Sequence, residues 1–182
     1  MRSLLLLFLI AGCASSGGQD SIVKTFDLGT AAPKAQLPAL RSVSVRAPMP
    51  FDGVDMYYRL AWRDGAEIAS FAQNRWAAPP AELVRRQILR ALPATGAAPC
   101  ALEVELQDFS QVFSSKEASE ARLEMRAALI AGNTRVAARS VQVAEAAPSA
   151  NAAGGAAAFA RASERAVSEL AEWIALQAAC RS

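Results

Sequence analysis

The chain has 182 residues, of which 53% are hydrophobic and 20% charged, and its formal net charge is +2. This composition suits one domain with a hydrophobic core, and so small a charge argues against nucleic acid as a partner. The sequence contains no histidine, which excludes Ser-His-Asp catalysis, Cys-His catalysis and zinc sites with histidine ligands. We therefore expect no enzyme, no metal and no cofactor. The enzymatic alternative is an envelope hydrolase with two convergent carboxylates.

The first residues, MRSLLLLFLIAGC, have the pattern of a bacterial lipoprotein signal. The apolar run over 4–10 is far shorter than the roughly 20 residues that a membrane-spanning helix needs. Ile10-Ala11-Gly12-Cys13 fits the lipobox, in which the cysteine thiol is acylated and the cysteine becomes the first mature residue. We predict a signal peptide over 1–12, lipid attachment with palmitate at Cys13, and a flexible tether over 13–20. The alternative is an ordinary secretory signal with an incidental cysteine.

The residues after the lipobox indicate a compartment. Ala14 stands where an aspartate would favour retention in the inner membrane of a diderm bacterium. We therefore predict an outer-membrane protein that faces the periplasm. Because the periplasm is oxidising, Cys100 and Cys180 are predicted to form a disulfide that joins the last helix to the sheet. The alternative is a pair of buried free thiols.

Alternating apolar and polar residues predict half-buried strands, most clearly in ALEVELQDF, EARLEMRAALI and TRVAARSVQV. Two-residue hairpin turns are expected at Asp64-Gly65 and Gly132-Asn133. The predicted strands cover residues 22–28, 42–47, 56–62, 67–72, 101–109, 120–130 and 134–143.

The last predicted hairpin contains a conflict. Straight pairing from the turn puts Leu129 opposite Val136, but it also puts Arg126 opposite Arg139, which is unfavourable. One extra residue within 138–140 removes this conflict, and it pairs Met125 with Val141 and Leu123 with Val143. We therefore predict a β-bulge at 138–140.

Two helices complete the domain. The first, over 81–92, follows Pro79-Pro80, since proline is favoured at helix starts. The second runs to about residue 179 and starts at Asn151 or after Gly155. Its expected buried stripe is Phe159, Ala162, Ala166, Leu170 and Trp173 or Ile174. The prediction is an α/β domain of α+β character over 21–182, in which a mixed or mostly antiparallel sheet carries both helices on one face.

Several motifs follow one another in the first half of the chain. A strand ends near Pro48, a Tyr58-Arg59 strand follows, and Arg75-Trp76-Ala77 precedes Pro79-Pro80 and a helix. This order resembles the ABC-type transport auxiliary lipoprotein family, the PqiC-like group of membrane integrity-associated transporter subunits. The lipobox, the length and the late helix agree with the resemblance. The usual Tyr of the family's first strand is replaced by Thr25-Phe26, and the carboxyl half agrees only in pattern.

The resemblance implies a role. Such proteins are non-catalytic outer-membrane subunits of lipid transport systems that pair an ABC transporter with an MCE-domain protein. It implies an MCE-domain partner with its ABC transporter, with phospholipid as a further ligand and a homo-oligomer as a further option. The alternatives are a structural envelope lipoprotein that handles no lipid, and a lipoprotein of another export machine. A lipid-handling protein needs an apolar groove, whereas a scaffold needs only a flat patch.

Five residues are predicted to bind the partner: Arg59, Arg75, Trp76, Pro79 and Pro80. Tryptophan and arginine carry much of the binding energy at protein interfaces, and the prolines would hold the approach to the helix rigid. In the structural alternative, Trp76 packs in the core and the prolines only start the helix. For Tyr58 and Arg59 the corresponding alternative is a core tyrosine and an arginine paired on the sheet.

Overall fold

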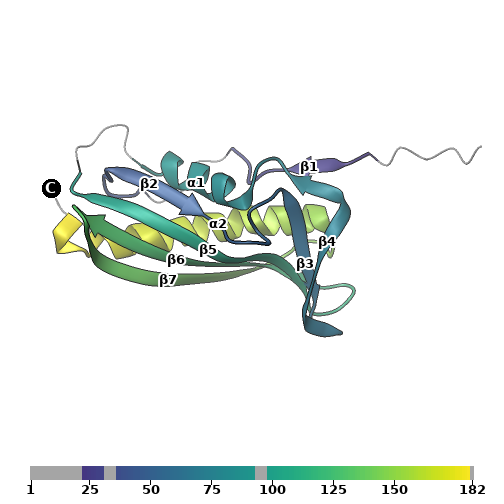
Figure 1. Ribbon diagram of the computed structural model, residues 1–182. Coiled ribbons are helices and arrows are strands. Elements are labelled where there is room, and N and C mark those ends of the chain that lie inside the picture. Colours follow the sequence, from purple (N-terminus) through teal and green to yellow (C-terminus); the bar gives the residue numbers. More distant parts are fainter. Residues whose placement is uncertain (1–21, 31–35, 93–97, 181–182) are drawn as a thin grey trace, which may run out of the picture.

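The computed structural model describes residues 22–30, 36–92 and 98–180. The predicted signal peptide, Cys13 and the tether lie outside these residues. The described residues form a mixed seven-stranded sheet and two main helices in a single α+β domain, which confirms the predicted fold class (Figure 1). The elements are β1 (Lys24–Phe26), β2 (Ser42–Arg46), β3 (Asp55–Leu60), β4 (Asp64–Trp76), α1 (Pro80–Arg90), β5 (Cys100–Phe113), β6 (Ser119–Ala131), β7 (Thr134–Ala146), α2 (Ala152–Ala175) and the 3-10 turn η1 (Ala178–Cys180).

Strand β5 organises the sheet. Its whole length pairs with β6 in antiparallel fashion, and β7 follows β6 at one edge. The other edge of β5 pairs with two strands. Strand β2 runs parallel to the first half of β5, and β3 runs parallel to the last residues of β5. Beyond β3 come β4 and then the short β1, which gives the order β1-β4-β3-β5-β6-β7. Parallel and antiparallel pairs therefore meet at one strand.

The β6–β7 hairpin confirms the predicted turn and corrects the predicted bulge. Gly132, with φ +58°, forms the two-residue turn with Asn133. Met125 pairs with Val141 and Leu123 with Val143, as predicted. Pairing is unbroken through residue 139, however, and the extra residue is Val136. Ala137 rather than Val136 then faces Leu129, so the wider Val136 side chain turns outward.

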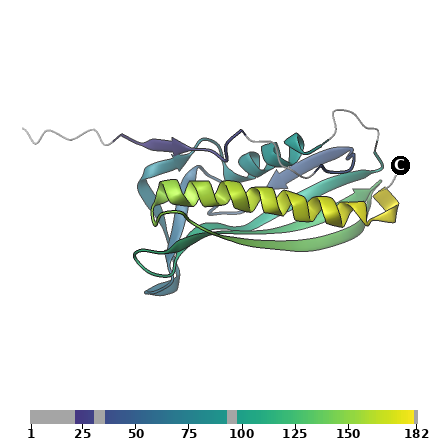
Figure 2. The ribbon, with the colours of Figure 1, turned by 180° about the vertical axis from the view of Figure 1, so that it is seen from behind.

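The β3–β4 hairpin also corrects a turn. Leu60 pairs with Asp64, so the connection is residues 61–63 and not Asp64-Gly65. Asp64 already belongs to β4, where its Oδ1 accepts a hydrogen bond of 2.8 Å from the Ala66 amide. The aspartate satisfies a backbone donor at the start of a strand rather than inside the turn. In both views the tip of this hairpin projects below the rest of the sheet, on the side away from the helices (Figures 1 and 2).

Both helices contribute to the single core on the same face of the sheet. Asn151 caps α2, since its Oδ1 accepts a hydrogen bond of 2.9 Å from the Gly154 amide. The helix begins at Ala152, so the alternative start after Gly155 is wrong. The predicted stripe of α2 is buried as a whole. Figure 2 shows α2 lying along β6 and β7, and α1 packs against β2 and α2.

The predicted disulfide is present between Cys100, the first residue of β5, and Cys180, the last residue of η1. Both cysteines are buried. The bond joins the segment after α2 to the sheet across 80 positions of sequence. Among the helices of the described residues, none is long and apolar enough to cross a membrane.

Candidate partner-binding surface

Trp76 lies in the core. It ends β4 with only 2% of its surface exposed. The indole meets Phe109 of β5 and Phe159 of α2 edge to face, with both ring centroids at 5.4 Å. The two phenylalanine rings stack on each other at 4.0 Å. Such aromatic contacts stabilise a core, so the structure corresponds to the alternative in which Trp76 serves packing.

The double proline starts α1. Pro79 has extended backbone angles and precedes the first turn, and its carbonyl accepts hydrogen bonds from the Glu82 and Leu83 amides. Pro80 is the first helical residue and is buried. A proline there loses no hydrogen bond, because the first amides of a helix have no helical acceptor. The junction after Trp76 thus holds the chain at a fixed angle between β4 and α1.

Arg75 and Arg59 are both engaged within the β3–β4 hairpin and its neighbour β5. Arg75 pairs with Asp55 at 3.1 Å and donates to the Phe71 carbonyl at 2.6 Å. Arg59 lies 3.8 Å from the carboxylate of Asp108 and is largely buried. These contacts tie strands together. A docking role for either arginine stays a prediction.

Tyr57 lies beside the Asp55–Arg75 pair. Its hydroxyl is 3.5 Å from the Asp55 carboxylate, and its ring meets Phe51 edge to face. Burial and the negative charge of Asp55 raise the pKa of Tyr57 above the ordinary value of 10.0. The neutral phenol is therefore the form that this site favours.

The five predicted residues do not form one surface. Trp76 and Pro80 are internal, Pro79 is partly buried at the start of α1, and the two arginines belong to ion pairs between strands.

A hollow of about 430 Å³ lies on the sheet face opposite the helices and crosses β2, β5, β6 and β7. No local sequence pattern predicted it. We call it the open-face groove. Its charged and hydroxyl-bearing lining residues are Ser44, Arg46, Glu103, Glu105, Arg126 and Arg135.

The open-face groove is polar. Arg46 and Glu105 form an ion pair across β2 and β5. Arg126 and Arg135 are exposed and have no ion-pair partner among the described residues. Among its apolar lining residues, Val104 and Ala127 are buried and Val45 packs against the core, so the side chains that lie between the charges are those of Ala128 and Ala138. Charged groups of both signs can bind complementary charges on a protein. They disfavour a lipid acyl chain, because the chain would bury these charged side chains without partners, which costs free energy.

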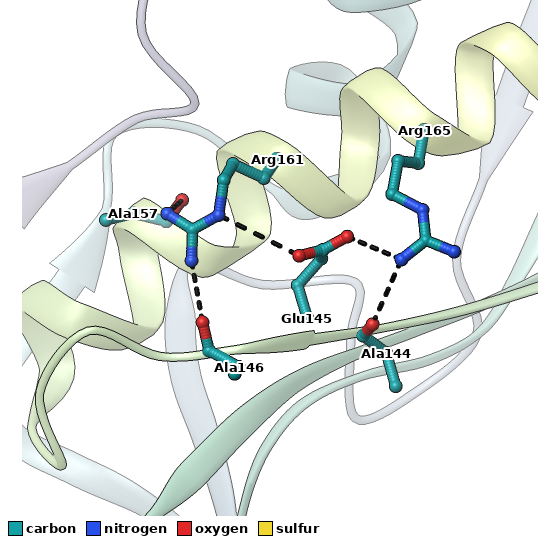
Figure 3. Close-up of polar contacts among 6 residues, drawn as sticks. All are labelled: Ala144, Glu145, Ala146, Ala157, Arg161 and Arg165. Atoms are coloured by element: carbon teal, nitrogen blue, oxygen red, sulfur yellow. Dashed lines mark hydrogen bonds and ion pairs between the residues drawn. The ribbon is translucent and has the colours of Figure 1, made fainter.

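A second feature lies at the free edge of β7. The Glu145 carboxylate accepts a hydrogen bond of 2.6 Å from Arg165 and lies 3.8 Å from Arg161 (Figure 3). The same two arginines donate to the carbonyls of Ala144 and Ala146. The hydrogen bond from Arg165 to Glu145 raises the pKa of Arg165. We call Glu145, Arg161 and Arg165 the arginine clamp.

The described residues hold no cluster of three or more His, Cys, Asp or Glu side chains that could bind a metal ion. The open-face groove and the arginine clamp present arginines, carboxylates and backbone carbonyls. This chemistry suits recognition of another polypeptide.

Known proteins resemble the chain in fold. No protein-family model matches it, and no curated protein matches it. Protein XCC0632 from Xanthomonas campestris, whose description names the DUF330 family, superposes with a TM-score of 0.70 and 19% identity over 83% of this chain and 94% of that one. A second crystal structure, of an uncharacterized protein, superposes with a TM-score of 0.62 and 13% identity over 84% of this chain and 99% of that one. The likeness shows that the chain shares this fold over almost the full length of both structures.

Proposed function

We propose that this chain is a non-catalytic, lipid-anchored subunit of the outer membrane that docks an MCE-domain protein of an ABC-type lipid transport system. The lipobox at Cys13 supplies the anchor, and the motif order around Arg75-Trp76 supplies the resemblance to transport auxiliary lipoproteins. The Cys100–Cys180 disulfide is consistent with an oxidising compartment such as the periplasm.

The observation that carries the docking role is the uncovered sheet face. Both helices pack on one side, while the open-face groove holds exposed Arg126 and Arg135 on the other. An uncovered sheet face with unpaired charges can bind a partner of complementary charge, and such charges also accelerate and orient association.

The polarity of this groove favours docking over lipid carriage. An acyl chain would contact Arg46, Glu105 and Arg126 in place of water, which is unfavourable. The role proposed here is therefore to hold the transport complex at the outer membrane while its partner conducts the lipid. A scaffold outside any lipid transport system is the second candidate, and the identity of the partner separates the two.

The test is crosslinking in living cells with a C-terminal tag, followed by identification of the proteins that co-purify. We expect an MCE-domain protein with the wild type and its loss with the Arg126→Glu/Arg135→Glu variant. Lys116→Glu, which changes a charge in the β5–β6 turn, is the control and should retain the partner. Recovery of only unrelated envelope proteins with the wild type would refute the proposed transport role.

The anchor is tested separately. Labelled palmitate should be incorporated into the wild type and not into Cys13→Ala, and the wild type should fractionate with the outer membrane. Wild type that carries no label would show that the incidental-cysteine alternative is correct.

A further inference from the structure

The outer edge of β7 has a regular pattern of backbone groups. The Ala147 amide donates to the Ser119 carbonyl at 2.8 Å, so odd-numbered residues of this segment point their backbone groups toward β6. Backbone groups alternate in direction along a strand. The amides and carbonyls of the even-numbered residues after the bulge therefore point away from the sheet.

Both ends of this edge are closed by the protein itself. At one end the arginine clamp occupies the carbonyls of Ala146, at 2.6 Å, and Ala144, at 3.4 Å (Figure 3). At the other end the bulge at Val136 interrupts the ladder. Bulges and charged side chains are the usual means by which proteins protect an edge strand.

Between these two ends lies an unprotected stretch, which we call the edge window: residues 138, 140 and 142. All three are exposed, and no hydrogen bond from the described residues reaches their outward backbone groups. Their side chains, those of Ala138, Ser140 and Gln142, are uncharged. An exposed edge of this kind is a template for another extended chain.

We propose that the edge window binds an extended, acidic segment of a partner protein, which pairs with β7 as an additional strand. This inference rests on the proposed function and deepens it, because it adds a strand-pairing site beside the open-face groove, with which the edge window shares Ala138. Backbone hydrogen bonds would provide affinity, as in other cases of strand addition. Only residues 138, 140 and 142 present free outward backbone groups between the bulge and the arginine clamp. The added strand would therefore form its hydrogen bonds with these three residues.

The charges around the edge window favour an acidic segment. On the helix side the cations are Arg139, Arg161 and Arg165 and the anions are Glu145 and Glu169. On the open face Arg126 and Glu124 lie opposite Ser140 and Gln142, and Arg135 precedes the bulge. Arg139 has only a 3.9 Å contact with Glu169, and Arg161 and Arg165 share one carboxylate. A segment with Glu or Asp on the face that points toward α2 would place negative charges beside Arg139, Arg161 and Arg165.

The same charges disfavour a second copy of the chain. A two-fold axis at Ser140 would make the Arg139 side chains of both copies diagonal neighbours on the helix face, since Arg139 points toward α2. It would also bring both α2 helices, with their arginine clamps, side by side. Like charges at this spacing are destabilising.

The binding test uses the full mature chain in detergent and a fluorescent peptide, acetyl-EVTVEVTE-amide, measured by anisotropy. We expect saturable binding to the wild type and to Ser140→Ala, and at least tenfold weaker binding to Ser140→Pro. The proline removes only an outward amide, which an edge strand tolerates. The matched peptide with Lys in place of Glu should bind at least tenfold more weakly. Equal binding of both peptides, equal binding to Ser140→Pro, or no saturable binding would overturn the proposal.

A second probe covers the case in which Ser140→Pro fails to fold. In this experiment the protein is wild type, and the acidic peptide carries methyl groups on the backbone amide nitrogens along one of its two edges. That edge of the peptide can then no longer donate hydrogen bonds to β7. Loss of binding supports strand pairing, and retained binding overturns it. A wild-type dimer that Ser140→Pro abolishes, with no peptide binding, would identify a second copy as the occupant and would also overturn the proposal.

The cellular experiment separates this inference from the proposed function. If the MCE-domain protein is recovered equally with wild type and a folded Ser140→Pro variant, the edge window is wrong and the proposed function stands. If the acidic peptide binds the edge window but no MCE-domain protein co-purifies with the wild type, the edge window stands and the proposed function is wrong.

Discussion

Gly155 of α2 lies against the side-chain amide of Gln111 on β5, so that a Cβ at position 155 would lie 2.6 Å from Gln111 Cδ and still closer to Oε1. The Gln111 amide nitrogen donates to Ser119 Oγ at 2.7 Å and to the Asn151 carbonyl at 3.1 Å. One buried glutamine therefore joins β5, β6 and the start of α2. The glycine is required by this close approach, although glycine is a poor helix former.

This contact predicts that Gly155→Ala is destabilising. Alanine would gain about 1 kcal/mol of helix propensity, but the overlap with Gln111 requires a shift that costs about 1–3 kcal/mol or more. We expect a net decrease in the free energy of unfolding, measured by urea denaturation. Adding Gln111→Ala should remove the clash, so the effects of the two changes should not be additive.

The control for Gly155→Ala is Gly65→Ala in β4, where a new Cβ meets nothing within 4 Å. This change should leave stability unchanged within about 0.5 kcal/mol. If Gly155→Ala were as stable as the wild type, the close approach to Gln111 would not exist in solution.

Replacing Trp76 of β4 and Trp62 of the preceding turn by alanine should lower the free energy of unfolding by very different amounts. Trp76 is buried between Phe109 and Phe159, so Trp76→Ala should cost about 3–5 kcal/mol. Trp62 is 45% exposed at the hairpin turn and contacts Arg63, so Trp62→Ala should cost no more than about 0.5 kcal/mol. Thermal melting followed by circular dichroism measures both. Similar melting temperatures for the two variants would contradict the core position of Trp76.

This difference also affects any docking experiment at position 76. A Trp76→Ala protein that loses a partner could have lost its fold instead. Arg75→Ala is the sharper probe, because Arg75 is partly exposed and its loss leaves the aromatic core intact.

The elements that could be predicted from the sequence are those that depend on neighbouring residues. Alternation indicated β5 and β6, and the apolar stripe indicated the buried face of α2, because each reports one local period. The Met125–Val141 register was predictable because a clash of arginines had to be avoided. The position of the bulge was not, since a shift at Val136 or at 138–140 gives the same later pairing.

The strand order and the candidate surfaces could not be predicted in this way. That β2 and β3 share β5 is a property of the whole sheet. The open-face groove and the free edge of β7 both follow from that order, so no local pattern marks them. The role of Arg75 depends on Asp55 in another strand, and the burial of Trp76 depends on Phe159 in α2.

The raised pKa of Tyr57 predicts a pH dependence. Since the folded protein holds the phenol proton more tightly than the unfolded chain, the stabilisation is fully present below pH 10.0 and is lost as the pH rises through the folded pKa. The free energy of unfolding should therefore fall more steeply above pH 10 in the wild type than in Tyr57→Phe. Urea denaturation at pH 8 to 11, with phenolate absorbance as a second readout, measures this. Identical pH profiles for the two proteins would contradict the raised pKa.

The Cys100–Cys180 disulfide should be a large contributor to stability. It closes a loop across 80 positions, and loop closure of this length reduces the entropy of the unfolded chain by an amount worth about 4 kcal/mol. The Cys100→Ala/Cys180→Ala variant should therefore unfold at a clearly lower urea concentration than the oxidised wild type.

Reduction of the wild type provides the matched control for this variant. Dithiothreitol should lower the urea midpoint of the wild type toward that of the double-alanine variant, and it should leave the variant unchanged. Thiol titration of the unfolded protein should find no reaction at Cys100 or Cys180 before reduction and reaction at both after it. If reduction leaves the midpoint of the wild type unchanged, the bond does not restrict the unfolded chain as its loop length requires, and the packing of η1 and α2 alone holds this end of the domain to β5.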